Sequence, residues 1–496
     1  MGNYTKLAVK GVVVVFVVTL IAGFLGYVAR IILARNLAIE EFGLFYSVLS
    51  FLGLLWTFQS LGFDKATSRF IPQFLHKKQY SSIKSSIIYV NAVQLATNAI
   101  IITAVYLLSD FLAGNFFHNS EAGIILRLMA IAFFADSFVL TLKSTFQGFR
   151  SMIYFAGIDA VRMALIVVIM SAGIWLNYGI LSPVYAYIIT PFVLLAVFGS
   201  ILVKRVFPQF SQAEFFVDKN LIKKISRYSI FILASSVGGV VLYYTDILML
   251  TYLTDLRSVA LYSVALPTAK VLMHFPRAIG GILVPLTVEL WVKKKKDILS
   301  AGIEALYKYN IILIIPIVFA IFSFTDIIIN LFYGQQYSEA GNVLKILIIG
   351  MIFAVLYGIN INFFAGTYKP EITSKIVYTA AVFNLITNII FIPKFGIIGA
   401  AITTTLSYFI MMIMGFFYIR KFIKISFPIR EWTKTLLAGI ICTLSIWSLK
   451  KILFLNVWLE AFIVLAVSGM IYIGLLFLLN IVSLKEIKDI YNRIAK

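Results

Sequence analysis

The sequence predicts an all-α polytopic membrane protein. It has about fourteen transmembrane helices, arranged as two six-helix lobes in a parallel pseudo-twofold repeat plus two extra C-terminal helices. The prediction rests on composition, on the number of long apolar runs and on an internal repeat. Hydrophobic residues make up 61% of the 496 residues and charged residues 13%, against roughly half and a quarter in soluble domains. Lipid must therefore be the solvent for most of the chain, which excludes a soluble enzyme, a nucleic-acid-binding domain and a disordered chain.

Apolar runs of the length that a bilayer core requires, about 17 to 25 residues, recur along the whole chain. The predicted spans are 11–35, 43–63, 86–108, 123–143, 155–176, 182–203, 229–251, 259–290, 309–331, 343–366, 377–393, 397–419, 434–449 and 456–481. The first run is too long for a signal peptide and lacks a small-residue cleavage site, so it is interpreted as a span.

The positions of the basic residues predict the orientation of these spans. If the N-terminus is cytoplasmic, 32 of the 42 Lys and Arg residues fall in cytoplasmic segments. Those segments are 1–10, 64–85, 143–162, 204–228, 291–308, 367–376, 420–434 and 482–496. The positive-inside rule then predicts that both termini are cytoplasmic. We expect a multi-pass protein of the plasma membrane. The net charge of +21 is explained by topology and by attraction to membrane lipids, without nucleic acid.

Three short segments in the first half of the chain recur in the second half at nearly constant spacing. The pairs are 36–48 with 252–264, 146–148 with 364–366, and 177–180 with 394–397. Their offsets of 216 to 218 residues each fall at equivalent span boundaries. Six spans per repeat give both lobes the same orientation, and such repeats place the substrate path between them.

The repeat divides the chain into four predicted parts. Residues 1–205 form an N-lobe with spans one to six, and 206–228 form a cytoplasmic linker. Residues 229–421 form a C-lobe with spans seven to twelve, and 422–496 carry the last two spans and a cytoplasmic tail.

No catalytic or cofactor-binding signature stands in the sequence. The single Cys442 excludes an intramolecular disulfide and a multi-cysteine metal site, and the three histidines are widely separated. Neither GxxxxGK[ST] nor HExxH is present. We therefore expect no enzyme activity, no cofactor and no metal site.

Basic residues inside span eight are the strongest site candidates, because a charge at bilayer depth costs roughly 2.5 to 3.5 kcal/mol and usually faces a cavity. Lys270, His274 and Arg277 share one face of a helix by their spacing. The prolines and glycines of the span predict a kink; they are Pro267, Pro276, Pro285, Gly280 and Gly281. A kinked helix with a basic stripe suits the path of an anion. The alternative is that Lys270 and Arg277 extend to opposite membrane surfaces.

Arg30 and Arg35 lie near the end of span one and are further candidates. Arg30 is the deeper, either in a cavity or extending to the surface, whereas Arg35 fits an outer-surface anchor near Glu40 and Glu41. Asp246 in span seven is the repeat counterpart of Arg30, which suggests an Arg30–Asp246 pair across the lobe interface as one alternative.

The other acidic candidate is Asp136 in span four, with Lys143 two turns later. Asp159 and Arg162 in span five are three residues apart and are interpreted as a local ion pair.

Three motifs give the chain a family resemblance. Residues 26–45 (GYVARIILARNLAIEEFGLF) resemble the opening of the polysaccharide transporters in the multidrug/oligosaccharidyl-lipid/polysaccharide (MOP) flippase superfamily. Residues 61–74 (LGFDKATSRFIPQF) are similar to the segment after their second span, and 146–150 (FQGFR) to their loop between spans four and five.

The resemblance implies two helix bundles around a central cavity. It also implies alternating-access transport of a polyprenyl-diphosphate-linked oligosaccharide to the outer leaflet, for cell-surface glycan synthesis. A related branch uses cations on spans one and eight, positions near Arg30 and Lys270 here. Arg30, Lys270, His274 and Arg277 are thus the predicted substrate-binding residues, and Arg35, Asp136 and Asp246 the secondary ones. Polysaccharide assembly proteins are expected partners.

Two other functions remain open. A multidrug and toxin extrusion exporter of the same superfamily would suit an acidic cavity and twelve spans. A membrane polysaccharide polymerase or ligase would be expected to carry a large catalytic outer loop, whereas the longest predicted one, 109–122, has about fourteen residues.

Overall fold

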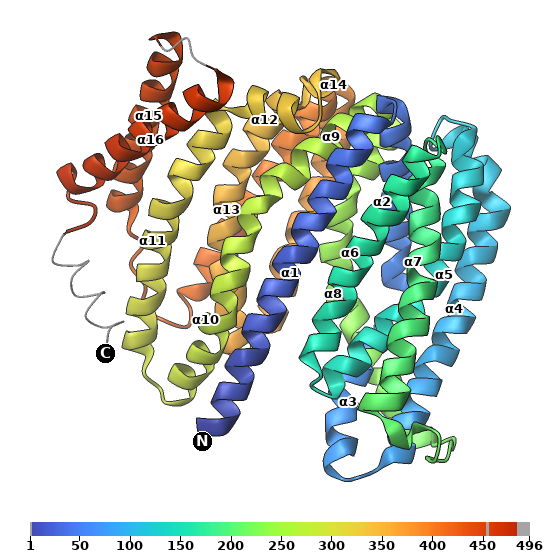
Figure 1. The fold of residues 1–496 in the computed structure, drawn as a ribbon. Helices are drawn as coiled ribbons and strands as arrows, with labels where there is room; N and C mark the ends of the chain where they lie inside the picture. The colour runs from blue at the N-terminus through green and yellow to red at the C-terminus, as the bar shows by residue number, and fades with distance from the viewer. Residues whose placement is uncertain (1, 453–455, 484–496) are drawn as a thin grey trace. The chain divides into compact units, whose positions relative to one another are not determined.

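A computed structural model describes residues 2–452 and 456–483, without the side chains of residues 2–14, 277, 278, 282 and 457. Within these ranges every regular element is a helix (Figure 1). Most of the predicted C-terminal tail, 484–496, lies outside the described residues.

The first half of the chain forms long apolar helices and one short helix, α3. In chain order they are α1 (Gly2–Asn36), α2 (Ile39–Ser60), α3 (Phe63–His76), α4 (Tyr80–Asn115), α5 (Glu121–Gly148), α6 (Met152–Trp175), α7 (Leu181–Ile201) and α8 (Lys219–Leu253).

The second half continues in the same manner, with a short helix α12. Its helices are α9 (Leu256–Lys270), α10 (His274–Val292), α11 (Lys296–Ser323), α12 (Thr325–Phe332), α13 (Ala340–Gly366), α14 (Pro370–Ile419), α15 (Ile429–Ile452) and α16 (Val457–Leu478).

The number of spans agrees with the sequence prediction. Among the described residues, thirteen helical segments are long and apolar enough to cross a membrane, with α9 and α10 counted as one. One of the thirteen, α14, consists of two helices that meet at Gly396, whose combination of a φ of 54° and a ψ of −132° only glycine adopts readily. Counting these two separately gives fourteen, so the all-helical polytopic fold class is confirmed.

Apart from shifts of the helix ends, the structure differs from the predicted spans in two places. Span nine was placed at 309–331, but α11 ends at Ser323 and α12 follows as a separate helix. The segment 64–85, predicted only as a cytoplasmic connection, contains α3. This helix buries Phe63, Phe70 and Ile71 on one side and exposes basic residues on the other.

The kink predicted in span eight is present. A single 3-10 turn, Val271–Met273, separates α9 from α10, between Pro267 and Pro276. Lys270 therefore ends one helix and His274 begins the next.

Backbone turns repeat along the chain with the period seen in the sequence. Eight of the twelve described residues with a positive φ form four pairs separated by 216 to 218 positions. The pairs are Lys78 with Lys294, His118 with Gly334, Arg150 with Tyr368, and Gly179 with Gly396. The two halves therefore place a positive-φ residue at four equivalent positions.

Close helix contacts repeat as well. Gly148 and Gly366 are the last residues of α5 and α13. A Cβ atom would lie 3.0 Å from the carbonyl oxygen of Thr67 at Gly148, and 3.1 Å from that of Val284 at Gly366. Both glycines permit the same close helix approach, at positions 218 residues apart.

The described chain divides into two compact units. One comprises residues 1–264 and 381–400, and the other 265–380 and 401–496. The unit boundaries follow packing, whereas the predicted lobes follow the repeat, and the two do not coincide. The predicted bounds of the four parts therefore stay a prediction; they are 1–205, 206–228, 229–421 and 422–496.

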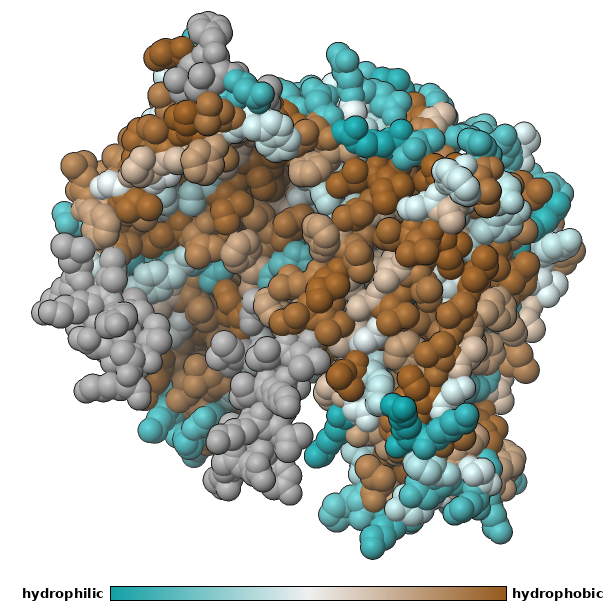
Figure 2. Space-filling model, in the orientation of Figure 1, coloured by the Kyte–Doolittle hydropathy of each residue, from teal (hydrophilic) through white to brown (hydrophobic). Residues whose placement is uncertain are grey.

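In the first unit α5 packs against α2, α3, α4, α6 and α7, and α8 packs against α2 and α3. The segment after α7 lies on the start of α4, where Lys84 Nζ donates to the carbonyl of Ala213 at 2.8 Å. Hydrophobic side chains cover the flanks of these helices and hydrophilic ones gather toward the helix ends (Figure 2). This distribution matches a lipid-facing surface.

In the second unit α13 packs against α10, α11 and α12, and the two C-terminal helices lie against α11. Lys450 Nζ donates to the carbonyl of Ser323, and Tyr472 Oη to that of Ile312, both at 2.8 Å. These bonds tie α15 and α16 to the unit.

Candidate functional site

Arg30 lies in the last two turns of α1, half-buried in the first unit. Its guanidinium carbon is 4.1 Å from the centroid of the Tyr46 ring, and its Nη1 donates to the carbonyl of Ser263. Within the described part of the chain no carboxylate pairs with Arg30, so the predicted Arg30–Asp246 pair is wrong. The ring face and the carbonyl orient the guanidinium but leave its full positive charge, which suits it to bind an anion.

Arg35, a secondary candidate, stands in the exposed last turn of α1. A cation at this end of a helix interacts favourably with the helix dipole. Its position fits a surface anchor better than a binding residue.

The basic stripe of span eight crosses the break between α9 and α10. Lys270 and His274 lie on either side of the 3-10 turn, and both are half-buried. The side chain of Arg277 lies outside the described residues. Whether the three residues bind substrate stays a prediction.

Asp246 lies within a buried polar cluster of the first unit, where its residue is only 2% exposed. Tyr262 Oη donates to Oδ2 at 2.6 Å, and the amide nitrogens of Asn388 and Asn384 donate to Oδ1 at 2.8 and 3.3 Å. Sequence spacing gave no sign of this cluster, because its members come from three distant segments.

Replacing Asp246 by alanine should destabilise the protein, because three buried donors would lose their acceptor. Unsatisfied buried donors cost roughly 1–3 kcal/mol each in soluble proteins and less in membranes. We expect a clear fall in the melting temperature in detergent, and a smaller one for Asp246→Asn, which keeps one acceptor oxygen. The control is Asp110→Ala, because Asp110 is exposed and pairs with Arg127. Equal shifts for Asp246→Ala and Asp110→Ala would contradict this role.

Asp136 pairs across helices rather than with its own neighbours. Arg162 Nη1 on α6 lies 2.5 Å from Asp136 Oδ1 on α5, and Lys143 Nζ on α5 lies 2.5 Å from Asp159 Oδ2 on α6. The predicted local pair of Asp159 with Arg162 is therefore wrong. Because α5 and α6 pack together, each carboxylate faces a cation on the opposite helix.

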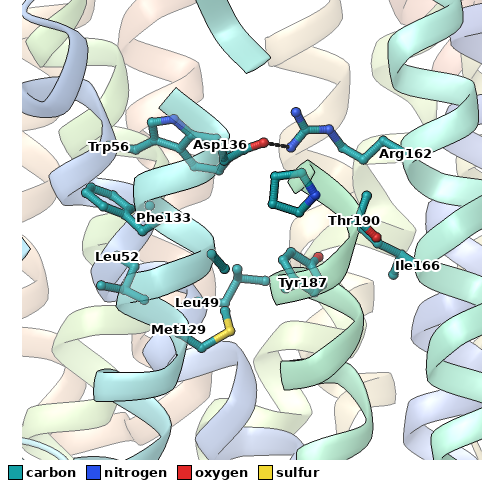
Figure 3. A pocket seen from close by; sticks show the side chains of 13 residues that line it. Leu49, Leu52, Trp56, Met129, Phe133, Asp136, Arg162, Ile166, Tyr187 and Thr190 are labelled. Carbon is teal, nitrogen blue, oxygen red and sulfur yellow. Dashed lines mark ion pairs between the residues drawn. The ribbon is translucent and has the colours of Figure 1, made fainter. Parts of the chain in front are cut away.

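A small cavity lies beside the Asp136–Arg162 pair (Figure 3). Its volume is about 40 Å³, and its walls come from α2, α5, α6 and α7. Trp56, Tyr187 and Thr190 also line it, together with apolar side chains. The sequence indicated only Asp136 here, because its polar neighbours look like ordinary packing residues.

In the described ranges, no three His, Cys, Asp or Glu side chains lie close enough together to hold a metal ion.

The fold defines a class of protein: an all-helical polytopic membrane protein with an internal repeat. The family model for polysaccharide biosynthesis proteins matches residues 8–291, more than half of the chain. The chain therefore belongs to the polysaccharide biosynthesis protein family, as the resemblance predicted. A second model, MatE, matches residues 232–390.

Relatives and a solved structure agree with this assignment. Membrane protein MJ1068 of Methanocaldococcus jannaschii is 32% identical over 511 residues, covering 100% of both chains. The "probable low-salt glycan biosynthesis flippase Agl15" of Haloferax volcanii is 24% identical over 250 residues, 50% of this chain and 53% of Agl15. The fold is similar to that of the lipid II flippase MurJ in an inward closed conformation. That match has a TM-score of 0.73 at 15% identity and covers 93% of this chain and 98% of MurJ. The chain is a flippase-like transporter of the MOP superfamily.

Proposed function

We propose that the protein is a flippase for polyprenyl-diphosphate-linked oligosaccharide, which it moves from the cytoplasmic to the outer leaflet by alternating access. The family, the name of Agl15 and the fold shared with MurJ support this class of cargo. The observation that carries the proposal is Arg30, a cation in a membrane-spanning helix with no carboxylate partner among the described residues. An anionic diphosphate head would offset its charge, while the polyprenyl tail stays in lipid.

The protein is proposed to work in the plasma membrane with both termini cytoplasmic, in contact with membrane lipids and polysaccharide assembly proteins. Reconstitution tests the transport step. Purified protein in vesicles should carry a lipid-linked oligosaccharide across the bilayer, measured as the fraction exposed to a membrane-impermeant lectin. Exposure no faster than in protein-free vesicles would refute the proposal.

Multidrug export is a second candidate function, because the MatE model matches residues 232–390. Uptake of a cationic dye such as ethidium by the same vesicles separates the two. Dye transport without oligosaccharide transport would favour the exporter. A polymerase or ligase has less support, since the names of Agl15 and MurJ describe flippases.

Cysteine labelling tests the proposed orientation. Cys442→Ser supplies a background without native cysteine and keeps a donor for the Ser468 carbonyl, which Cys442 Sγ contacts at 3.5 Å. Lys77→Cys and Lys293→Cys occupy equivalent exposed turns on the predicted inner side, and Ser120→Cys an exposed turn on the predicted outer side. An impermeant maleimide added to intact cells should label only position 120. Labelling at position 77 or 293 would contradict the proposed orientation.

A further inference from the structure

The cavity in the first unit contains polar groups that the proposed transport step does not use. Oδ2 of Asp136, the indole nitrogen of Trp56 and the hydroxyl of Thr190 are buried without a hydrogen-bond partner among the described residues. All three residues line the same cavity. Arg162 Nη1 lies 2.5 Å from Asp136 Oδ1 in a charge-assisted pair, so the ion pair satisfies Oδ1 and leaves Oδ2 to the cavity. A buried carboxylate oxygen without a partner costs free energy that a water molecule in the cavity would offset.

The cavity has the size and chemistry to hold water. One water needs about 10–15 Å³ of cavity volume and two to four polar partners. The available 40 Å³ has room for about three. The indole N–H of Trp56 and the hydroxyl of Thr190 can donate to water, and water can donate to Asp136. The Asp136 side chain is 7% exposed and that of Arg162 is 17% exposed.

We propose that Asp136 and Arg162 form a hydrated proton-binding site inside the first unit. A hydronium ion in the cavity transfers its proton to a carboxylate oxygen of Asp136 and leaves water behind. The site then changes from a neutral ion pair to a neutral carboxylic acid beside a cationic Arg162. A metal cation fits this place poorly, because Arg162 already neutralises the carboxylate and would repel a second positive charge.

The surroundings of Asp136 contain few other charges. The charged and titratable groups that face it or lie one helix away are Lys143 on its own helix, Asp159 and Arg162 on α6, Tyr187 on α7, Tyr46 on α2 and Arg30 on α1. On α4 the facing groups are the neutral Asn98, which donates to Ser137 at 2.8 Å, and Gln94, which accepts from Thr141 at 2.8 Å. Where α3 meets α5, Thr67 and Ile71 contact Gly148. Lys143 and Asp159 neutralise each other, so the charge of this region is set by Asp136, Arg162 and Arg30.

A chain of aromatic residues connects the proton site to Arg30. Tyr187 lies in the cavity wall, and its ring centroid is 5.6 Å from that of Phe45. The Phe45 ring in turn lies 5.3 Å from the ring of Tyr46, on which Arg30 stacks. Protonating Asp136 makes this region more positive, so a proton at Asp136 and an anion at Arg30 should favour each other. This link rests on the proposed function, whereas proton binding itself does not.

Infrared spectroscopy on the purified full-length protein in lipid nanodiscs, without substrate, tests the proton site. Difference spectra between high and low pH should contain a protonated-carboxyl C=O band that disappears in Asp136→Asn. The matched control is Asp159→Asn, which removes the carboxylate of the neighbouring pair on the same two helices and should keep the band. In Arg162→Gln the band should persist to higher pH, since the cation that favours the carboxylate is gone.

Each outcome decides the proposal. No such band in the wild-type protein, or a band unchanged in Asp136→Asn, overturns it. If Asp136→Asn does not fold, the Arg162→Gln variant decides. A band with the same pH dependence in Arg162→Gln and in the wild-type protein would then overturn the proposal. If the band behaves as expected but vesicles flip no oligosaccharide, the proton site is supported and the proposed substrate is refuted.

Discussion

Replacing Lys270, Arg277 or Arg30 by alanine is expected to abolish flipping, or to reduce it at least ten- to a hundredfold, while the protein reaches the membrane in normal amount. The proposed head group carries a diphosphate, and a hydrogen bond to a charged group contributes roughly 1.5–3 kcal/mol. Each 1.4 kcal/mol corresponds to a tenfold change. The measurement is the rate at which lipid-linked oligosaccharide becomes lectin-accessible in vesicles.

Charge-preserving variants separate electrostatics from packing. Lys270→Arg and Arg30→Lys should each retain part of the activity, although lysine cannot reproduce the planar stacking of Arg30 on Tyr46. The control is Arg127→Ala, because Arg127 lies in the second turn of α5 and pairs with the exposed Asp110. This variant should flip oligosaccharide at the wild-type rate. Wild-type rates in all three alanine variants would show that these cations are structural. If a variant is lost from the membrane, its rate must be measured per folded molecule in a stabilised background, where a normal rate again contradicts the site.

The spans were predictable because bilayer thickness sets their length. Fourteen long apolar runs leave little freedom, and the helix ends fall mostly within a few residues of the predicted ones. Helix α3 was missed for the same reason. It is only 14 residues long and amphipathic, so a criterion of length and apolarity passes over it.

Partners across helices were much harder to predict than spans. Spacing alone favoured Asp159 with Arg162, because residues three apart share a helix face. The actual pairs depend on how α5 and α6 are rotated against each other, which the sequence does not state. The same holds for Asp246, whose partners Tyr262, Asn384 and Asn388 come together only in the fold.

The repeat connects sequence and packing at one further place. Residues 36–48 and 252–264 are the two copies of one motif, and in the first unit these copies touch each other. A Cβ atom at Gly43 would lie 1.9 Å from the carbonyl oxygen of Leu256 and 3.3 Å from the backbone nitrogen of Ala260. The counterpart of Gly43 in the second copy is Val259, which is fully buried. One copy must therefore be glycine so that the backbone of the other can approach.

Gly43→Ala is expected to remove most folded protein, because its Cβ would meet backbone atoms that cannot move aside. Overpacking commonly costs about 1–3 kcal/mol, and a clash with backbone should reach or exceed that range. Two further glycines make a graded series. Gly53→Ala, on the same helix, meets the Tyr244 ring at 2.5 Å, which can swing away, so its loss should be smaller. Gly199→Ala has nothing within 4 Å and should be neutral or stabilising by up to about 1 kcal/mol. Melting temperature and monodisperse yield in detergent rank the three, and a Gly43→Ala protein as stable as Gly199→Ala would show that α2 and α9 do not pack this closely.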